Sequence, residues 1–118
     1  MKKYLILLVI LLGLTQLFSQ PKNLTGIWAG KLSLPNSLEL TIVFNLSKDD
    51  SGKYISTLDS PDQGAMGIPT EGTTISDDSI LIKIPLVQGF YSGKIFFDEM
   101  KIDGKWFQGG MSLDLIVN

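Results

Sequence analysis

The stretch SLELTIVFNLS, residues 37–47, decides the fold class of this chain. Every second position in it is apolar, while most of the positions between are polar. The apolar set is Leu38, Leu40, Ile42, Phe44 and Leu46. A β-strand points successive side chains to opposite faces, so this alternation predicts a strand with one buried and one exposed face. Strands of this kind are typical of an antiparallel sheet that is covered on one side only.

The same period of two recurs along the chain, between closely spaced turn residues such as KDDSGK at 48–53. No ten-residue stretch beyond the N-terminal segment shows helical periodicity, so the pattern indicates an all-β protein. The expected strands are 24–33, 38–47, 53–59, a weak 72–76, 79–86, 89–97, 100–107 and 111–117.

A sequential antiparallel meander of seven or eight strands must either close or leave two unpaired edges. We expect closure into a small up-and-down barrel of the lipocalin/calycin-like kind. The interior of such a barrel is nearly filled by side chains or holds one small ligand. A two-sheet β-sandwich made from the same strands is the alternative.

Residues 1–19 have the pattern of a secretory signal peptide. Two lysines precede an apolar run, Tyr4–Leu14, that is shorter than the roughly 20 residues a spanning helix needs. We expect cleavage after Ser19, export to the periplasm or the medium, and one domain over 20–118 with no membrane contact. An uncleaved N-terminal anchor is the alternative.

Composition excludes several classes of function. The chain has ten lysines, no arginine and twelve carboxylates; without the two lysines of the signal segment, eight cations face twelve carboxylates and the net charge is −4. An acidic domain without arginine argues against nucleic-acid binding. The chain contains no cysteine and no histidine, which excludes disulfides, His- or Cys-ligated zinc and nucleophile–histidine catalysis within it. We therefore expect no metal and no cofactor.

Two carboxylates, Asp59 and Asp62, lie in the turn-rich stretch LDSPDQGAMGIP at 58–69. We interpret them as turn-capping residues, because Asp beside Pro commonly accepts hydrogen bonds from nearby backbone amides. A glycosidase needs carboxylates that face each other across a substrate, and calcium needs about six or more oxygen ligands. We expect no enzymatic activity from this pair.

Three polar residues are the candidate ligand contacts. Gln63 and Gln108 are each followed by glycine, and we expect them to face each other across one mouth of the barrel. A glutamine there can bind a ligand or tie two loops together; the sequence leaves both roles open, with the structural role the commoner one. Tyr91, if it faces inward, would supply a hydroxyl that orients a ligand.

Glycine-rich motifs accompany these residues at the start, the middle and the end of the domain: TGIWAG (25–30), SPDQGAMGIP (60–69) and IDGKWFQGG (102–110). We expect both tryptophans in them to pack in the core. The motif residues are Gly26, Trp28, Gly30, Ser60, Pro61, Asp62, Gly64, Gly67, Pro69, Gly104, Trp106, Gly109 and Gly110. Together the motifs resemble the N-terminal β-domain that precedes the catalytic domain in exported α/β-hydrolase (esterase- or peptidase-like) proteins of Bacteroidetes.

In that family the β-domain is followed by a hydrolase with G-x-S-x-G, an acid and a histidine. None of these catalytic elements can be carried onto this chain, which looks like the accessory domain alone. The resemblance implies a non-catalytic exported module that binds a small apolar or acyl ligand or docks to a hydrolase partner. A truncated serine esterase fragment without its catalytic domain is the alternative, and a stable domain that binds nothing is a third reading.

Overall fold

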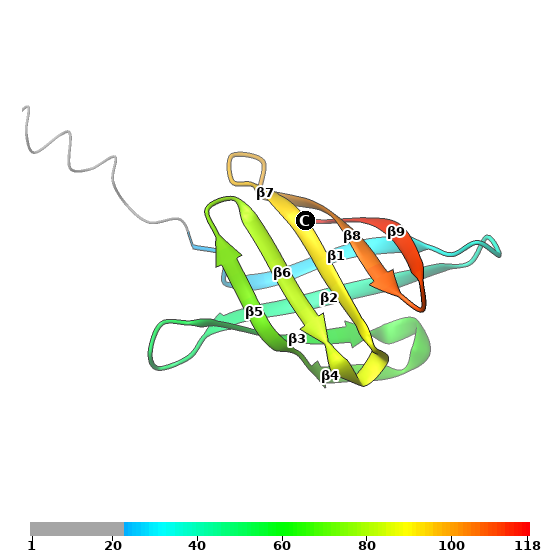
Figure 1. The fold of residues 1–118 in the computed structure, drawn as a ribbon, viewed down its shortest axis with the longest axis horizontal. Coiled ribbons are helices and arrows are strands. Elements are labelled where there is room, and N and C mark those ends of the chain that lie inside the picture. The colour runs from blue at the N-terminus through cyan, green and yellow to red at the C-terminus, as the bar shows by residue number, and fades with distance from the viewer. Residues whose placement is uncertain (1–22) are drawn as a thin grey trace, which may run out of the picture.

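The computed structural model describes residues 23–118, which form two antiparallel sheets (Figure 1). The first sheet contains β1 (Gly26–Ser33), β2 (Glu39–Lys48), β3 (Tyr54–Ser60) and β4 (Ala65–Pro69), in that order. The second contains β5 (Glu71–Ser76), β6 (Ser79–Ile84), β7 (Gly89–Phe96), β8 (Lys101–Gln108) and β9 (Met111–Val117). Two short 3₁₀ turns, η1 (Pro61–Gln63) and η2 (Pro85–Val87), lead into β4 and β7.

The predicted all-β antiparallel meander is confirmed, because each strand within a sheet pairs with the next in the chain. The structure adds one strand, β4, inside the turn-rich stretch at 58–69, where the sequence predicted none. It also ends β6 at Ile84, where Pro85 starts η2 instead of continuing the strand. The predicted signal segment, 1–19, lies outside the described residues. Within 23–118 no helix is long and apolar enough to cross a membrane.

The expected closed barrel is not formed, and the two-sheet alternative fits the structure. Only Thr70 separates β4 from β5, yet the two strands belong to different sheets. Pro69 ends β4 and has no N–H to offer a ladder. Beside it, hydroxyl contacts join the two sheets: the Ser56 Oγ lies 2.7 Å from both the Thr70 Oγ1 and the Thr73 Oγ1.

On the opposite side of the molecule, the first and last strands meet in one short contact. Ala29 and Asn118 exchange two backbone hydrogen bonds of 3.0 Å, each N–H donating to the other residue's carbonyl. The neighbouring Gly30 allows this approach, since a Cβ there would overlap the carbonyl oxygen of Ile116. We call this contact the β1–β9 seam.

The core lies between the sheets and is built from the inward-facing positions of every long strand. Trp28 is buried there, with its indole Nε1 donating to the Leu24 carbonyl at 2.9 Å. Tyr91 is completely buried and packs on Phe44, the ring centroids being 5.0 Å apart. The other core residues are Leu32, Ile42, Leu46, Leu58, Ile80, Ile82, Ile84, Ile95, Ile102, Trp106, Leu115 and Val117.

Candidate functional site

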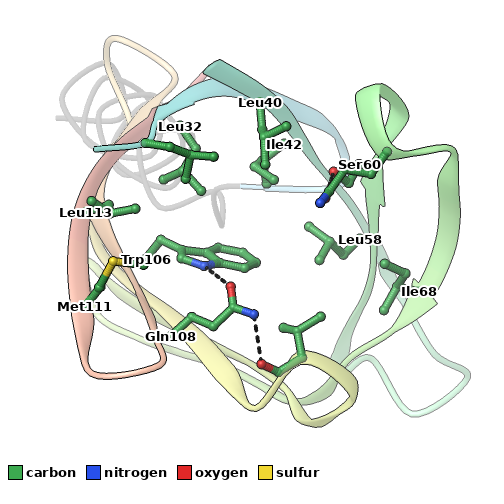
Figure 2. Close-up of a pocket in the computed structure, with 13 residues that line it drawn as sticks. Leu32, Leu40, Ile42, Leu58, Ser60, Ile68, Trp106, Gln108, Met111 and Leu113 are labelled. Carbon is green, nitrogen blue, oxygen red and sulfur yellow. Dashed lines mark hydrogen bonds between the residues drawn. The ribbon is translucent and has the colours of Figure 1, made fainter. Parts of the chain in front are cut away.

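An apolar cavity of about 150 Å³ opens between the two sheets at one end of the sandwich (Figure 2). Its lining comes from strand ends and turns that meet at this end: the β1–β2 and β8–β9 turns, η1, η2 and β4. The lining residues are Leu32, Leu34, Leu40, Ile42, Leu58, Ser60, Gln63, Ile68, Val87, Trp106, Gln108, Met111 and Leu113. None of them carries a charge.

The cavity arises because the inward-facing apolar series of β9 extends past the packed core. Val117 and Leu115 are 0% and 1% exposed, Leu113 is half-buried, and Met111 at the cavity end is 46% exposed. The face is apolar along its whole length, but near Met111 the opposite sheet no longer covers it. These side chains therefore present an apolar surface to the cavity.

Trp106 forms one wall, and its indole is held by a short chain of hydrogen bonds (Figure 2). The Trp106 Nε1 donates to the Oε1 of Gln108 at 3.0 Å, and the Gln108 Nε2 donates to the Val87 carbonyl at 3.0 Å. Because an indole N–H can only donate, this contact fixes which end of the Gln108 amide faces Trp106. Gln108 thereby ties β8 to η2 at the cavity mouth.

A second glutamine lies on the other side of the lining, in η1. The buried Ser60 hydroxyl donates to the Oε1 of Gln63 at 2.6 Å. The Nε2 of Gln63 makes no hydrogen bond within residues 23–118, and the residue is exposed. The free end of this amide is therefore a pair of N–H donors at the cavity rim.

The corners η1 and η2 share one geometry. Each begins with proline, after a residue with φ near −125° (−126° at Ser60 and −124° at Ile84). Each ends in a left-handed residue, Gly64 with φ 69° or Gln88 with φ 54°. Proline at the first position and a left-handed last residue are the features that start and stop such a turn. The two corners place Gln63 and Val87 at the same cavity.

Asp59 and Asp62 both accept hydrogen bonds from backbone amides, but neither caps its own turn as we expected: the amides belong to other strands, β4 for Asp59 and β2 for Asp62. Asp62 accepts from the N–H of Thr41 at 2.7 Å. Asp59 accepts from the N–H of Gly67 at 2.7 Å and from the Asn45 amide at 3.0 Å. The Gly67 N–H, followed by the Asn45 amide, holds the pKa of Asp59 below its ordinary value of 3.8.

Of the three predicted ligand contacts, the structure brings two to one cavity. Gln63 and Gln108 both line it, whereas Tyr91 lies in the core. The Tyr91 hydroxyl donates to the Leu115 carbonyl at 2.8 Å, with the Ile102 carbonyl at 3.4 Å. Burial raises the pKa of this hydroxyl far above its ordinary value of 10.0.

The other motif residues have distinct positions. Gly26 begins β1, Trp28 and Trp106 are buried at separate places in the core, and Gly104 lies on β8 against the Tyr91 ring. Gly109 and Gly110 form the two-residue β8–β9 turn, with positive φ at both, as a primed hairpin turn requires. The SPDQGAMGIP motif forms β3's last residue, η1 and β4.

The sequence did not single out Ile68 or Val87 as lining residues. Ile68 lies inside the turn-rich stretch at 58–69, and Val87 follows the expected strand 79–86, which in the structure ends before Pro85. A usable signal was present: Pro61 and Pro85 each stand three residues before the left-handed residue that closes the turn.

No protein-family model, no curated protein and no solved structure matches this chain. Across the described part of the chain, acidic side chains do not gather in a group that could hold a metal ion.

Proposed function

We propose that this domain is a non-catalytic binding module that takes a small apolar molecule, or the end of an acyl chain, into the cavity next to Trp106. The observation that carries the proposal is the apolar lining with a few polar groups at the mouth, which is a common form of small-molecule site. The cavity volume of about 150 Å³ equals that of an engineered apolar cavity that takes up benzene.

The partly exposed apolar series of β9 supports the same proposal. Met111 is exposed and Leu113 is only partly covered by protein, so an apolar molecule bound in the cavity would remove their remaining surface from water. If these side chains served stability alone, covering them with protein would bury more apolar surface and stabilise the fold further.

The chemistry of the chain supports a binding role without catalysis. It has no histidine or cysteine, and the two carboxylates of the turn-rich stretch at 58–69, Asp59 and Asp62, accept hydrogen bonds from backbone amides. The motifs that resemble the β-domain of exported α/β-hydrolases support the additional proposal of an exported accessory module that works beside such an enzyme.

The cavity proposal can be tested with benzene as the probe. We expect benzene to shift the Trp106 indole N–H signal in ¹H–¹⁵N NMR spectra saturably, while the Trp28 indole signal, bonded to Leu24 elsewhere in the core, stays in place. The substitution Ile68→Phe adds volume at the cavity wall and should weaken benzene binding about tenfold or more.

Ile75→Phe is the matched control, because Ile75 is equally half-buried on the next strand but does not line the cavity. It should bind benzene as the unmodified protein does. Absence of saturable binding by the unmodified protein would refute the proposed function.

A further inference from the structure

Among the side-chain nitrogens and oxygens that line the cavity, the Nε2 of Gln63 is the one without a hydrogen bond within residues 23–118. The Oε1 of Gln63 already accepts one hydrogen bond from Ser60, and the Oε1 of Gln108 accepts one from Trp106, so each keeps one lone pair. Both N–H groups of the Gln63 Nε2 and one N–H of the Gln108 Nε2 are free to donate. A ligand group placed there meets N–H donors on both sides of the mouth.

The charges near the mouth favour a neutral ligand. No lysine lines the cavity: Lys31, next to the lining residue Leu32, is exposed and donates to the Thr41 hydroxyl at 2.9 Å, and Asp62 directly precedes Gln63 in η1. A carboxylate ligand would leave water without a cation in the lining to pair with and would lie near that aspartate. Burying an unpaired charge costs much more than burying a hydrogen-bonded neutral oxygen.

A cationic or donor-only head group is also a poor match. An ammonium group has three N–H donors that need acceptors, and each amide oxygen at the mouth already accepts one hydrogen bond from a buried donor, which leaves it one lone pair. Its N–H groups would face the N–H groups of Gln63, which leaves donors unpaired on both sides.

We propose that the ligand class is a neutral carbonyl compound with a short apolar tail, such as a ketone or an ester. The tail fills the space beside Trp106, and the carbonyl oxygen accepts a hydrogen bond from the Nε2 of Gln63. This inference rests on the proposed function, because it assumes that the cavity is a binding site.

The test compares four six-carbon probes by isothermal titration and by the Trp106 indole signal: 2-hexanone, hexane, hexanoate and hexylammonium. One added neutral hydrogen bond should make 2-hexanone bind about fivefold tighter than hexane. Hexanoate and hexylammonium should each bind about tenfold or more weakly than 2-hexanone.

Gln63→Glu keeps the size of the side chain and its acceptor for Ser60 but replaces the free donors with an acceptor. It should lower the affinity for 2-hexanone about fivefold, to that of hexane, and raise the affinity for hexylammonium. Gln88→Glu makes the same chemical change at the end of η2, outside the cavity lining, and should leave the order of probes unchanged.

The possible results separate the two proposals. If none of the four probes binds, the proposed function fails. If hexane binds as well as 2-hexanone, or hexanoate binds best, the cavity is a binding site but the inference about the carbonyl group is wrong. Loss of the 2-hexanone preference in Gln63→Glu but not in Gln88→Glu would support it.

Discussion

The carboxylate of Asp62 accepts a hydrogen bond from the backbone N–H of Thr41 at 2.7 Å, across 21 residues of chain. Thr41 lies on β2 beyond the part that pairs with β3, because that ladder reaches only to Val43 opposite Asp59. The side chain of Asp62 therefore supplies an acceptor where β3 no longer offers a carbonyl. It fixes η1, and with it Gln63, against the edge of the first sheet.

Asp62→Ala should lower the free energy of unfolding by about 1 kcal/mol, because the N–H of Thr41 loses its partner at a partly solvated site. Urea unfolding measures the loss, and hydrogen exchange of the Thr41 amide should become faster. Asp50→Ala, at an aspartate with no hydrogen bond in residues 23–118, should change stability by less than about 0.5 kcal/mol. Equal effects of the two substitutions would contradict this role of Asp62.

Asp59 should make stability depend on pH in the acid range. Its folded pKa lies below the ordinary value of 3.8, so its stabilising contribution is fully present above 3.8 and is lost as the pH falls through the folded pKa. Asp59→Asn can still accept from the Gly67 N–H but does not titrate, so its free energy of unfolding should fall less steeply below pH 3.8.

Urea unfolding at a series of pH values would measure this slope. A residual slope is expected in Asp59→Asn, because the Ser51 hydroxyl and the Lys53 N–H also hold the pKa of Asp49 low. If Asp59→Asn keeps the slope of the unmodified protein, the hydrogen bonds to Asp59 do not stabilise the fold.

Gly30→Ala should open the β1–β9 seam. The added Cβ would overlap the carbonyl oxygen of Ile116, which is backbone and cannot rotate away. We expect a loss of about 3 kcal/mol in unfolding free energy and faster exchange of the Ala29 and Asn118 amides. Ser33→Ala, at an exposed position of the same strand, is the control and should be nearly neutral. Normal stability of Gly30→Ala would show that the seam is not tightly packed.

Tyr91→Phe should cost about 1 kcal/mol, because it removes the buried hydroxyl that donates to the Leu115 carbonyl while keeping the ring that packs on Phe44. Its effect on benzene binding should be negligible, since Tyr91 does not line the cavity. Ser92→Ala, at the next and exposed position on β7, is the control for stability. Weaker benzene binding in Tyr91→Phe without a loss of stability would return Tyr91 to the candidate ligand contacts.

Period-two alternation was enough to predict every strand except β4, because it depends only on which face of each strand is apolar. It was not enough to predict how tightly that face is covered: Leu115 and Met111 have the same alternation, yet only Leu115 is buried. Coverage depends on the opposite sheet, and no local pattern encodes it.

The sequence pointed to those cavity residues that stand next to recognisable turn residues. Gln63 and Gln108 stood out because glycine follows each, whereas Tyr91 was indistinguishable from an inward-facing ligand contact until its bond to Leu115 was seen. Closure of the meander depended on contacts between distant parts of the chain, such as Ala29 with Asn118. The sequence pattern does not show whether the two edge strands, β1 and β9, pair along their full length or at a single residue pair.

Thr70, the single residue between β4 and β5, decides whether the first and last strands run parallel or antiparallel. The seven strand pairings within the sheets are all antiparallel, and the chain adds no hairpin at Thr70. An odd number of reversals leaves β1 and β9 pointing in opposite directions, which is what the reciprocal bonds between Ala29 and Asn118 require. A hairpin inserted at Thr70 would add one reversal, make these strands parallel, and remove that pair of bonds without changing a residue near it.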